Sequence, residues 1–387
     1  MLDRRRLLSA TSCGLAAALL PHAAMAQDAK LPNPLSWTAY DVGSGGYNQS
    51  VAIGKALKDA MGVDLRVLPG KNDVSRQVPL REKKVDFSAT GVGAAYLAQE
   101  GVFEFGAKGW GPQPVRVLLA ANSDSNLTIG VAADAGIKEM KDLKGKRVAW
   151  VVGSPSLNEN VGAMLAFAGL TWADVKKVEF PGFGQSWDGI KGNLVDAAFA
   201  QTTSGKVFEA AASPRGLYWP PLPHADKEGW ARLTAKAPFF QPSKGTEGAN
   251  LSPEKPHEGA TYPYPILIAY ADQKDDVVHA MTKAMVELFP KYKDASPGIN
   301  GWALARQNYE WAVPYHPGAI RYFKEIKTWT DKAQAHNDKL LARQGVLKAA
   351  WDEISAKNIA DEKAFEASWA ELRAKKLEAA GMAAVYK

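Results

Sequence analysis

Cysteine is nearly absent from this sequence, which contains a single one, Cys13. Cys13 lies within residues 1–26, a segment that we expect to be removed on export, so the mature chain has no thiol, no disulfide and no cysteine-bound metal. Histidine is also scarce, and the six histidines never adopt the H-E-x-x-H spacing of a zinc enzyme. We therefore expect no metal site and no cofactor.

Long apolar runs and a strong charge of one sign are missing as well. The chain has 47 Lys and Arg against 41 Asp and Glu, a net charge of +6, and no dense basic run interleaved with aromatic residues. This mild balance argues against nucleic acid as the natural partner. The hydrophobic share of 46% is typical of a globular protein, and 387 residues are enough for two domains.

The first 26 residues predict export. Three arginines, Arg4–Arg6, precede a short, weakly apolar run, and Ala24-Met25-Ala26 forms an A-x-A cleavage site. The arginines followed by two leucines resemble a twin-arginine signal. Ala10 stands where a lipoprotein signal has leucine, so we expect no lipid anchor. The predicted location is the periplasm, with cleavage near Ala26.

One pattern of strand, turn and helix occurs twice. The segments "YDVGSGGYNQS" and "VVGSPSLNENV" both lead from an apolar strand through a glycine-serine turn into a helix. The same number of residues separates Gly43 from Asp86 in the first copy and Gly153 from Asp196 in the second. This duplication predicts an α/β fold of two lobes, each with a parallel core sheet, joined by a hinge.

The expected domain limits follow from this repeat. Residues 27–123 form the first part of lobe I, 124–266 form lobe II, and 267–387 return to lobe I and end in a helical extension. The crossings between the lobes are expected near Asn122 and Tyr270, and the Pro- and Gly-rich segment 238–265 is expected to be a long surface loop. Apolar residues of the C-terminal region are expected to be buried or interfacial: Trp329, Leu340, Leu341, Trp351, Phe365 and Trp369.

Nucleotide and hydrolase motifs fail at specific positions. A dinucleotide fingerprint needs glycine where Asn48 stands, and no Gly-Lys-Ser/Thr triplet follows Gly43. In "GFGQSWDG", Asp188 replaces the second glycine of G-x-S-x-G. The glycine turns instead offer backbone N–H groups at the partly positive start of a helix, where a small carboxylate binds without an arginine. Two such turns that face each other predict a clamp for a small organic anion.

Three further segments carry a family likeness: "GSGGYNQSVAIGKAL", "DLKGKRVAWVVGSPSLNENVGAMLAFAGL" and "VPYHPGAIRYFKE". With them, the chain resembles the TAXI-type solute receptors of tripartite ATP-independent periplasmic (TRAP) transporters from Ser36 to Glu325. The resemblance implies a two-lobed, type II-like periplasmic binding protein that delivers a small organic acid to a TRAP-type membrane permease. The chain departs from the family at Arg76, where asparagine is common, and at Gly91-Val92-Gly93, where Gln-Ser-Asp is frequent.

The predicted ligand-binding residues lie in the turns and at the strand ends of both lobes. They are Gly45, Gly46, Tyr47, Arg76, Thr90, Gly91, Ser154, Ser156, Asn158, Gln185, Ser186, Trp187 and Gln201. His316 is interpreted as a structural residue of a turn. No catalytic residue is predicted, and an enzyme or a ligand-sensing subunit on the same scaffold is the alternative.

Overall fold

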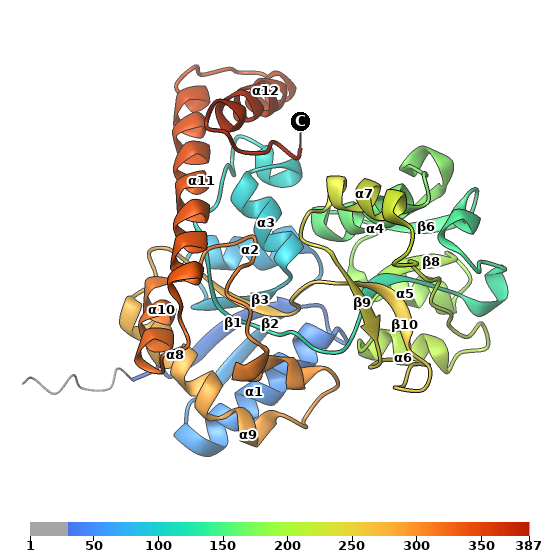
Figure 1. Cartoon of the computed structure of the whole chain (residues 1–387), viewed down its shortest axis with the longest axis horizontal. Coiled ribbons are helices and arrows are strands. Elements are labelled where there is room, and N and C mark those ends of the chain that lie inside the picture. Colours follow the sequence, from blue (N-terminus) through green and yellow to red (C-terminus); the bar gives the residue numbers. More distant parts are fainter. Residues whose placement is uncertain (1–29, 387) are drawn as a thin grey trace, which may run out of the picture.

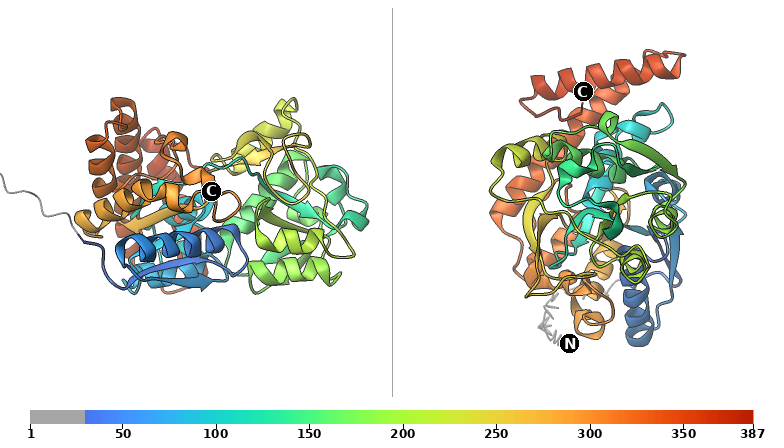
Figure 2. Two further views of the ribbon diagram at one scale, coloured as in Figure 1. Left: turned by 90° about the horizontal axis from the view of Figure 1, so that it is seen from below. Right: turned by 90° about the vertical axis from the view of Figure 1, so that its right-hand side faces the viewer.

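Two β-sheets, each covered by helices, divide the computed structural model into two lobes that lie side by side (Figure 1). The structure describes residues 30–386, and the predicted signal segment lies outside them. The views in Figure 2 show the same two bodies, with the C-terminal helices attached to lobe I.

Lobe I contains a five-stranded sheet of order β2-β1-β3-β11-β4. Its strands are β1 (Leu35–Tyr40), β2 (Leu65–Gly70), β3 (Phe87–Thr90), β4 (Val115–Ala120) and β11 (Ile266–Tyr270). The first three are parallel, whereas β11 runs antiparallel to both of its neighbours. Burial is nearly complete along β1 because helices cover both faces, and Leu35, Trp37 and Ala39 are fully buried.

Lobe II repeats this arrangement in a four-stranded sheet of order β5-β8-β6-β7. Its strands are β5 (Leu127–Val131), β6 (Arg147–Val151), β7 (Lys176–Phe180) and β8 (Ala197–Gln201). The order β7-β6-β8 matches β2-β1-β3 of lobe I, so the duplication predicted from the glycine turns is confirmed. The parallel core predicted for each lobe is present as β2-β1-β3 and β7-β6-β8, and β11 and β5 join these cores as antiparallel strands.

The helices follow the same division. Lobe I has α1 (Gly45–Met61), α2 (Asp73–Arg81), α3 (Val92–Glu100), α8 (Asp275–Glu287), α9 (Phe289–Tyr292), α10 (Pro317–Glu325), α11 (Asp331–Ser355) and α12 (Glu362–Ala379). Lobe II has α4 (Pro155–Phe167), α5 (Phe183–Lys191), α6 (Gly205–Ala211) and α7 (Lys227–Lys236). Helix α1 begins directly after the first glycine turn and α4 after the second, as the repeat predicts.

The two crossings between the lobes run beside each other. One joins β4 to β5, and the other precedes β11, where the backbone N–H of Ala121 donates to Pro265 (2.9 Å) and that of Tyr264 donates to Ala121 (2.8 Å). The expected crossing near Tyr270 is wrong, because Tyr270 pairs with Val115 at the opposite end of β4. The two connections between the lobes therefore lie at residues 121–126 and 262–265.

The segment 238–265 is not the surface loop that its prolines and glycines predict. It contains an antiparallel pair, β9 (Gln241–Gly245) and β10 (His257–Thr261), and its aromatic residues are buried. Phe239, Phe240 and Tyr262 pack on one another with ring centroids 4.9–5.4 Å apart. Burial of this aromatic cluster outweighs the turn preference of the surrounding residues.

The C-terminal extension is a helical hairpin, α11 and α12, with a small core of its own around Leu347, Phe365 and Trp369. It is fixed to lobe I through Glu100 of α3, which is fully buried and paired with both Arg343 and Arg373. Leu341 is not buried, because its side chain is 36% exposed.

Candidate ligand cleft

The turns at the carboxyl ends of the strands meet across the gap between the lobes. Asn72 caps α2 by accepting the N–H of Ser75 (2.8 Å), and its Nδ2 donates across the gap to the carbonyl of Val152 (3.1 Å). Beside it, the N–H of Val74 donates to the carbonyl of Gly153 (3.2 Å). The second turn of lobe I thus lies against the first turn of lobe II.

The glycine turn of lobe I makes the complementary contacts. The N–H of Gly45 reaches Ser204 Oγ (3.4 Å), and the carbonyl of Gly43 accepts the N–H of Lys206 at the start of α6 (3.2 Å). Asp41 Oδ2 accepts the N–H of Gly184 at the start of α5 (3.1 Å). Both lobes therefore contribute backbone groups to one closed interface.

A carboxylate of lobe I occupies the start of helix α4 in lobe II. Asp73 Oδ2 accepts the N–H of Ser156 at 2.7 Å, where the partial positive charge of the helix favours an anion. The expectation that this N–H is free for a ligand is wrong in this closed arrangement, because the protein's own carboxylate already accepts from it. Asp73 is 2% exposed and thus shielded from water.

Arg76 is the charge partner of Asp73. The two side chains form a buried ion pair, and Arg76 is only 1% exposed, so its interpretation as a solvated surface arginine is excluded. Its guanidinium carbon lies 3.4 Å from the centroid of the Tyr40 ring. Its Nε has no hydrogen-bond partner among residues 30–386.

Three buried tyrosines line the lobe I side of the cleft. The hydroxyl of Tyr40 accepts the N–H of Gly91 (3.1 Å), and that of Tyr264 accepts the N–H of Gly46 (3.3 Å). The hydroxyl of Tyr262 accepts from Asn160 of α4 (2.9 Å). Burial raises the pKa of all three hydroxyls, so they are neutral at neutral pH.

Sequence reasoning missed these tyrosines and Asp73. Tyr40 could have been found from its place at the end of the first strand, where ligands of such sheets bind. Tyr262 and Tyr264 lay in a segment that was interpreted as a loop. Asp73 carried no signal, because its role depends on a helix that begins more than eighty residues later.

Several buried polar atoms on the facing surfaces lack a partner within the described part of the chain. Besides Arg76 Nε, they include Ser154 Oγ, Asn160 Oδ1 and Gln201 Oε1. Ser154 is the cap of α4, yet its hydroxyl accepts no helix N–H. Gly45 approaches Gln201 so closely that a Cβ there would lie 2.3 Å from Oε1, so only glycine fits without a shift. Three of these atoms belong to predicted site residues: Arg76 of lobe I, and Ser154 and Gln201 of lobe II.

Other predicted site residues are held by their own lobe. The amide of Asn158 bonds to both the N–H and the carbonyl of Val151 (2.9 Å each). The hydroxyl of Ser186 donates to the carbonyl of Phe183 (2.7 Å), and Trp187 is fully buried with its Nε1 donating to a strand carbonyl of lobe II (3.2 Å). These three side chains are internal supports of lobe II.

The remaining predictions fall near the turns. Thr90 is buried at the end of β3, and Gly91 caps α3 with its N–H donating to the Tyr40 hydroxyl. Tyr47 is half-buried in the first turn of α1 and packs against the core of the molecule. Gln185 is half-buried in the first turn of α5, with its Oε1 buried and without a partner among the described residues.

Two absences within residues 30–386 bear on the chemistry of this protein. That part of the chain has no cluster of three His, Cys, Asp or Glu side chains able to hold a metal ion. None of its helices is both long enough and apolar enough to span a bilayer.

The geometry defines a two-lobed α/β protein in which polar groups of both lobes meet at their interface. A family model described as NMT1-like matches residues 43–326, well over half of the chain, so the protein belongs to the NMT1-like family. The match ends just after α10 and does not include the α11–α12 hairpin.

Solved structures with a related fold are distant in sequence. The alkanesulfonate-binding protein SsuA from Xanthomonas axonopodis pv. citri, bound to MOPS, is 14% identical with a TM-score of 0.44, over 81% of this chain and 85% of that one. PhnD1 from Prochlorococcus marinus, in complex with methylphosphonate, is 12% identical with a TM-score of 0.44, over 77% and 100%. An ancestral arginine-binding protein bound to arginine is 16% identical with a TM-score of 0.41, over 68% and 95%. The fold class itself rests on the sheet order of this chain.

Proposed function

We propose that this protein is a periplasmic solute receptor that binds a small organic anion between its lobes and delivers it to a TRAP-type membrane permease. The chain does this without catalysis. The observation that carries the proposal is the set of buried, unpartnered polar atoms on facing surfaces, led by Arg76 Nε and Ser154 Oγ. Buried polar groups in native proteins are nearly always hydrogen-bonded, so such a set favours a polar ligand.

The chemistry of the set favours a carboxylate. Arg76, whose charge is paired with Asp73, supplies the unpartnered Nε–H donor on lobe I, and Ser154 supplies an unpartnered hydroxyl at the start of α4 on lobe II. A carboxylate has two acceptor oxygens and can bond to both at once. The neutral amide of Gln201 and the tyrosine hydroxyls are available to hydrogen-bond the uncharged part of the ligand.

A ligand held in this way controls the hinge. Arg76 Nε and the Ser154 hydroxyl lie on different lobes, so a ligand that binds both stabilises only the arrangement in which the lobes meet. The crossings at 121–126 and 262–265 absorb the rotation, and the permease distinguishes the two arrangements by the different surfaces they present.

The TRAP assignment and the periplasmic location rest on the sequence. The segment "VPYHPGAIRYFKE" supports a TAXI-type receptor, and residues 1–26 support export. The permease class decides the energy source, since a TRAP permease uses an ion gradient and other receptor-dependent permeases use ATP.

Two coupled experiments test the proposal. Native mass spectrometry of the protein purified from periplasm is expected to show one small organic acid that is released on unfolding. Uptake of that acid into permease vesicles is expected to require this protein and a sodium or proton gradient. Uptake driven by ATP would contradict the TRAP assignment, and conversion of the acid by the protein alone would favour the enzyme alternative.

A further inference from the structure

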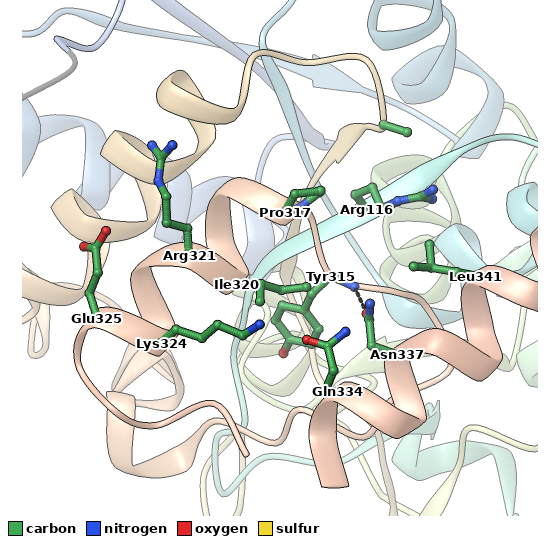
Figure 3. Close-up of a pocket in the computed structure, with 11 residues that line it drawn as sticks. Arg116, Tyr315, Pro317, Ile320, Arg321, Lys324, Glu325, Gln334, Asn337 and Leu341 are labelled. Carbon is green, nitrogen blue, oxygen red and sulfur yellow. Dashed lines mark hydrogen bonds between the residues drawn. The ribbon is translucent and has the colours of Figure 1, made fainter. Parts of the chain in front are cut away.

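A cavity of about 810 Å³ lies on lobe I, away from the cleft between the lobes (Figure 3). Helix α10 forms one wall and the first half of α11 forms the other, so the cavity exists because the C-terminal hairpin folds back on lobe I. Its volume falls in the range of small-molecule sites in proteins, about 300–1,000 Å³. It is lined by Arg116, Ala271, Tyr315, Pro317, Ile320, Arg321, Lys324, Glu325, Gln334, Asn337 and Leu341.

Arg116 of β4 is the unusual member of this lining. One of its guanidinium nitrogens, Nη1, donates to the carbonyl of Val115 (2.8 Å) and to the side chain of Gln344. No acidic side chain within residues 30–386 forms an ion pair with it, although most other arginines of lobe I have one. Nη2 and Nε have no hydrogen-bond partner in the described chain, and the Arg116 side chain lines the cavity with its guanidinium on the side of Leu341 (Figure 3).

The surroundings of Arg116 destabilise its charged form. Arg116 is half-buried, and burial lowers its pKa to about 10 with no carboxylate to offset the effect. A buried charge is normally paired, because removal from water disfavours the charged form. An anion in the cavity would supply the missing partner through a bidentate contact.

The rest of the lining fits an anion with an apolar body. Tyr315, Ile320 and Leu341 give the cavity hydrophobic walls, and Lys324 extends toward Ile320 and Tyr315 in Figure 3. Lys324 has no ion-pair partner among the described residues. The acidic member, Glu325, is bonded to His279 at 2.8 Å and so does not neutralise Arg116.

We propose that the cavity between α10 and α11 is a second binding site, which takes an organic anion with an apolar body and holds its charged group on Arg116. This site is independent of the cleft and of the transport function proposed above. One wall of this site is formed by α11, which lies outside the segment matched by the family model, because that match ends before α11.

The mature chain has no cysteine, so a single probe can report on the cavity alone. Leu341→Cys carries a trifluoromethyl label at the rim of the cavity, and Leu194→Cys carries the same label on lobe II as a remote control. Acetate, hexanoate and 4-phenylbutyrate are titrated and followed by fluorine NMR, with 4-phenylbutan-1-ol as the uncharged analogue. We expect a saturable shift of the Leu341 label that is strongest with 4-phenylbutyrate, and none at Leu194.

Variants of Arg116 test directly whether its charge binds the anion. Arg116→Gln, which keeps a polar side chain beside Gln344, is expected to weaken binding at least tenfold, and Arg116→Lys less than that. Arg66→Ala removes an exposed arginine of β2 and is expected to change nothing. No saturable shift with any of the three acids, equal binding of the alcohol, or unchanged binding in a folded Arg116→Gln protein would overturn the proposal.

Discussion

Asp73→Asn is expected to separate the lobes. In the closed arrangement Asp73 is the only acidic partner of the buried Arg76 among the described residues, and it accepts the N–H of Ser156 at 2.7 Å. Asparagine keeps the size of the side chain but leaves Arg76 as an uncompensated charge. Loss of one member of a buried ion pair costs about 3–5 kcal/mol.

This cost applies to the closed arrangement only, because water reaches Arg76 once the lobes part. The equilibrium between closed and open forms should therefore shift about a hundred- to several-thousandfold toward the open form, at about 1.4 kcal/mol for each factor of ten. The free energy of global unfolding, measured from the open form, should change much less.

The distance between the lobes is the direct readout. Spin labels at Met61→Cys and Leu194→Cys, which are 49% and 62% exposed, sit on different lobes, and residues 27–387 contain no competing cysteine. Pulsed dipolar spectroscopy should show a longer distance in Asp73→Asn than in the parent. Asp59→Asn, an exposed carboxylate of α1, is the matched control.

A double variant separates charge from shape. Asp73→Asn combined with Arg76→Gln removes the lone charge and should return part of the population to the shorter distance. An unchanged distance in Asp73→Asn would refute the idea that this ion pair holds the lobes together.

Two further predictions concern stability. Burial lowers the pKa of His316 to about 4 from 6.5, so the unfolded chain binds more protons between these values; the resulting stabilisation is complete above pH 6.5 and is lost as the pH falls toward 4. Urea unfolding at pH 7 and pH 4 should show that His316→Asn, which can still cap α10, loses about 3 kcal/mol less over this range than the parent, and equal losses would contradict the assignment. Glu100→Gln leaves the buried Arg343 and Arg373 without their carboxylate and should cost about 3–5 kcal/mol, with faster hydrogen exchange in α12. Glu366→Gln, an exposed neighbour on α12, is the control, and equal exchange in the two variants would mean that the ion pairs do not fix the hairpin.

The repeat was predictable because its signals are local. A glycine turn between an apolar strand and a helix is determined by neighbouring residues, so Gly43 and Gly153 could be found and their spacing compared. The structure repeats the order β2-β1-β3 as β7-β6-β8, and this duplication followed from that spacing. The antiparallel entry of β5 and β11 did not, since it depends on where the chain crosses between the lobes.

The chemistry of the cleft was only partly predictable. Ser154 and Gln201 are predicted from their places in the repeat and Arg76 from the family resemblance, but Asp73 matters through a helix start that is distant in sequence. Trp187 is predicted to bind ligand but is buried within lobe II. A tryptophan in the first turns of α5 can face either the cleft or the sheet, and only packing against lobe II decides for the sheet.

The measurement that most directly tests a ligand held by both lobes is calorimetric titration of the co-purified acid into one variant from each lobe. Arg76→Lys keeps a charge for Asp73 but removes Nε, and Ser154→Ala removes the unpartnered hydroxyl of lobe II. Each lost bond to a charged ligand is worth about 1.5–3 kcal/mol, so each variant should weaken binding about ten- to a hundredfold. If either variant binds the acid as tightly as the parent, one lobe is sufficient and the clamp is wrong.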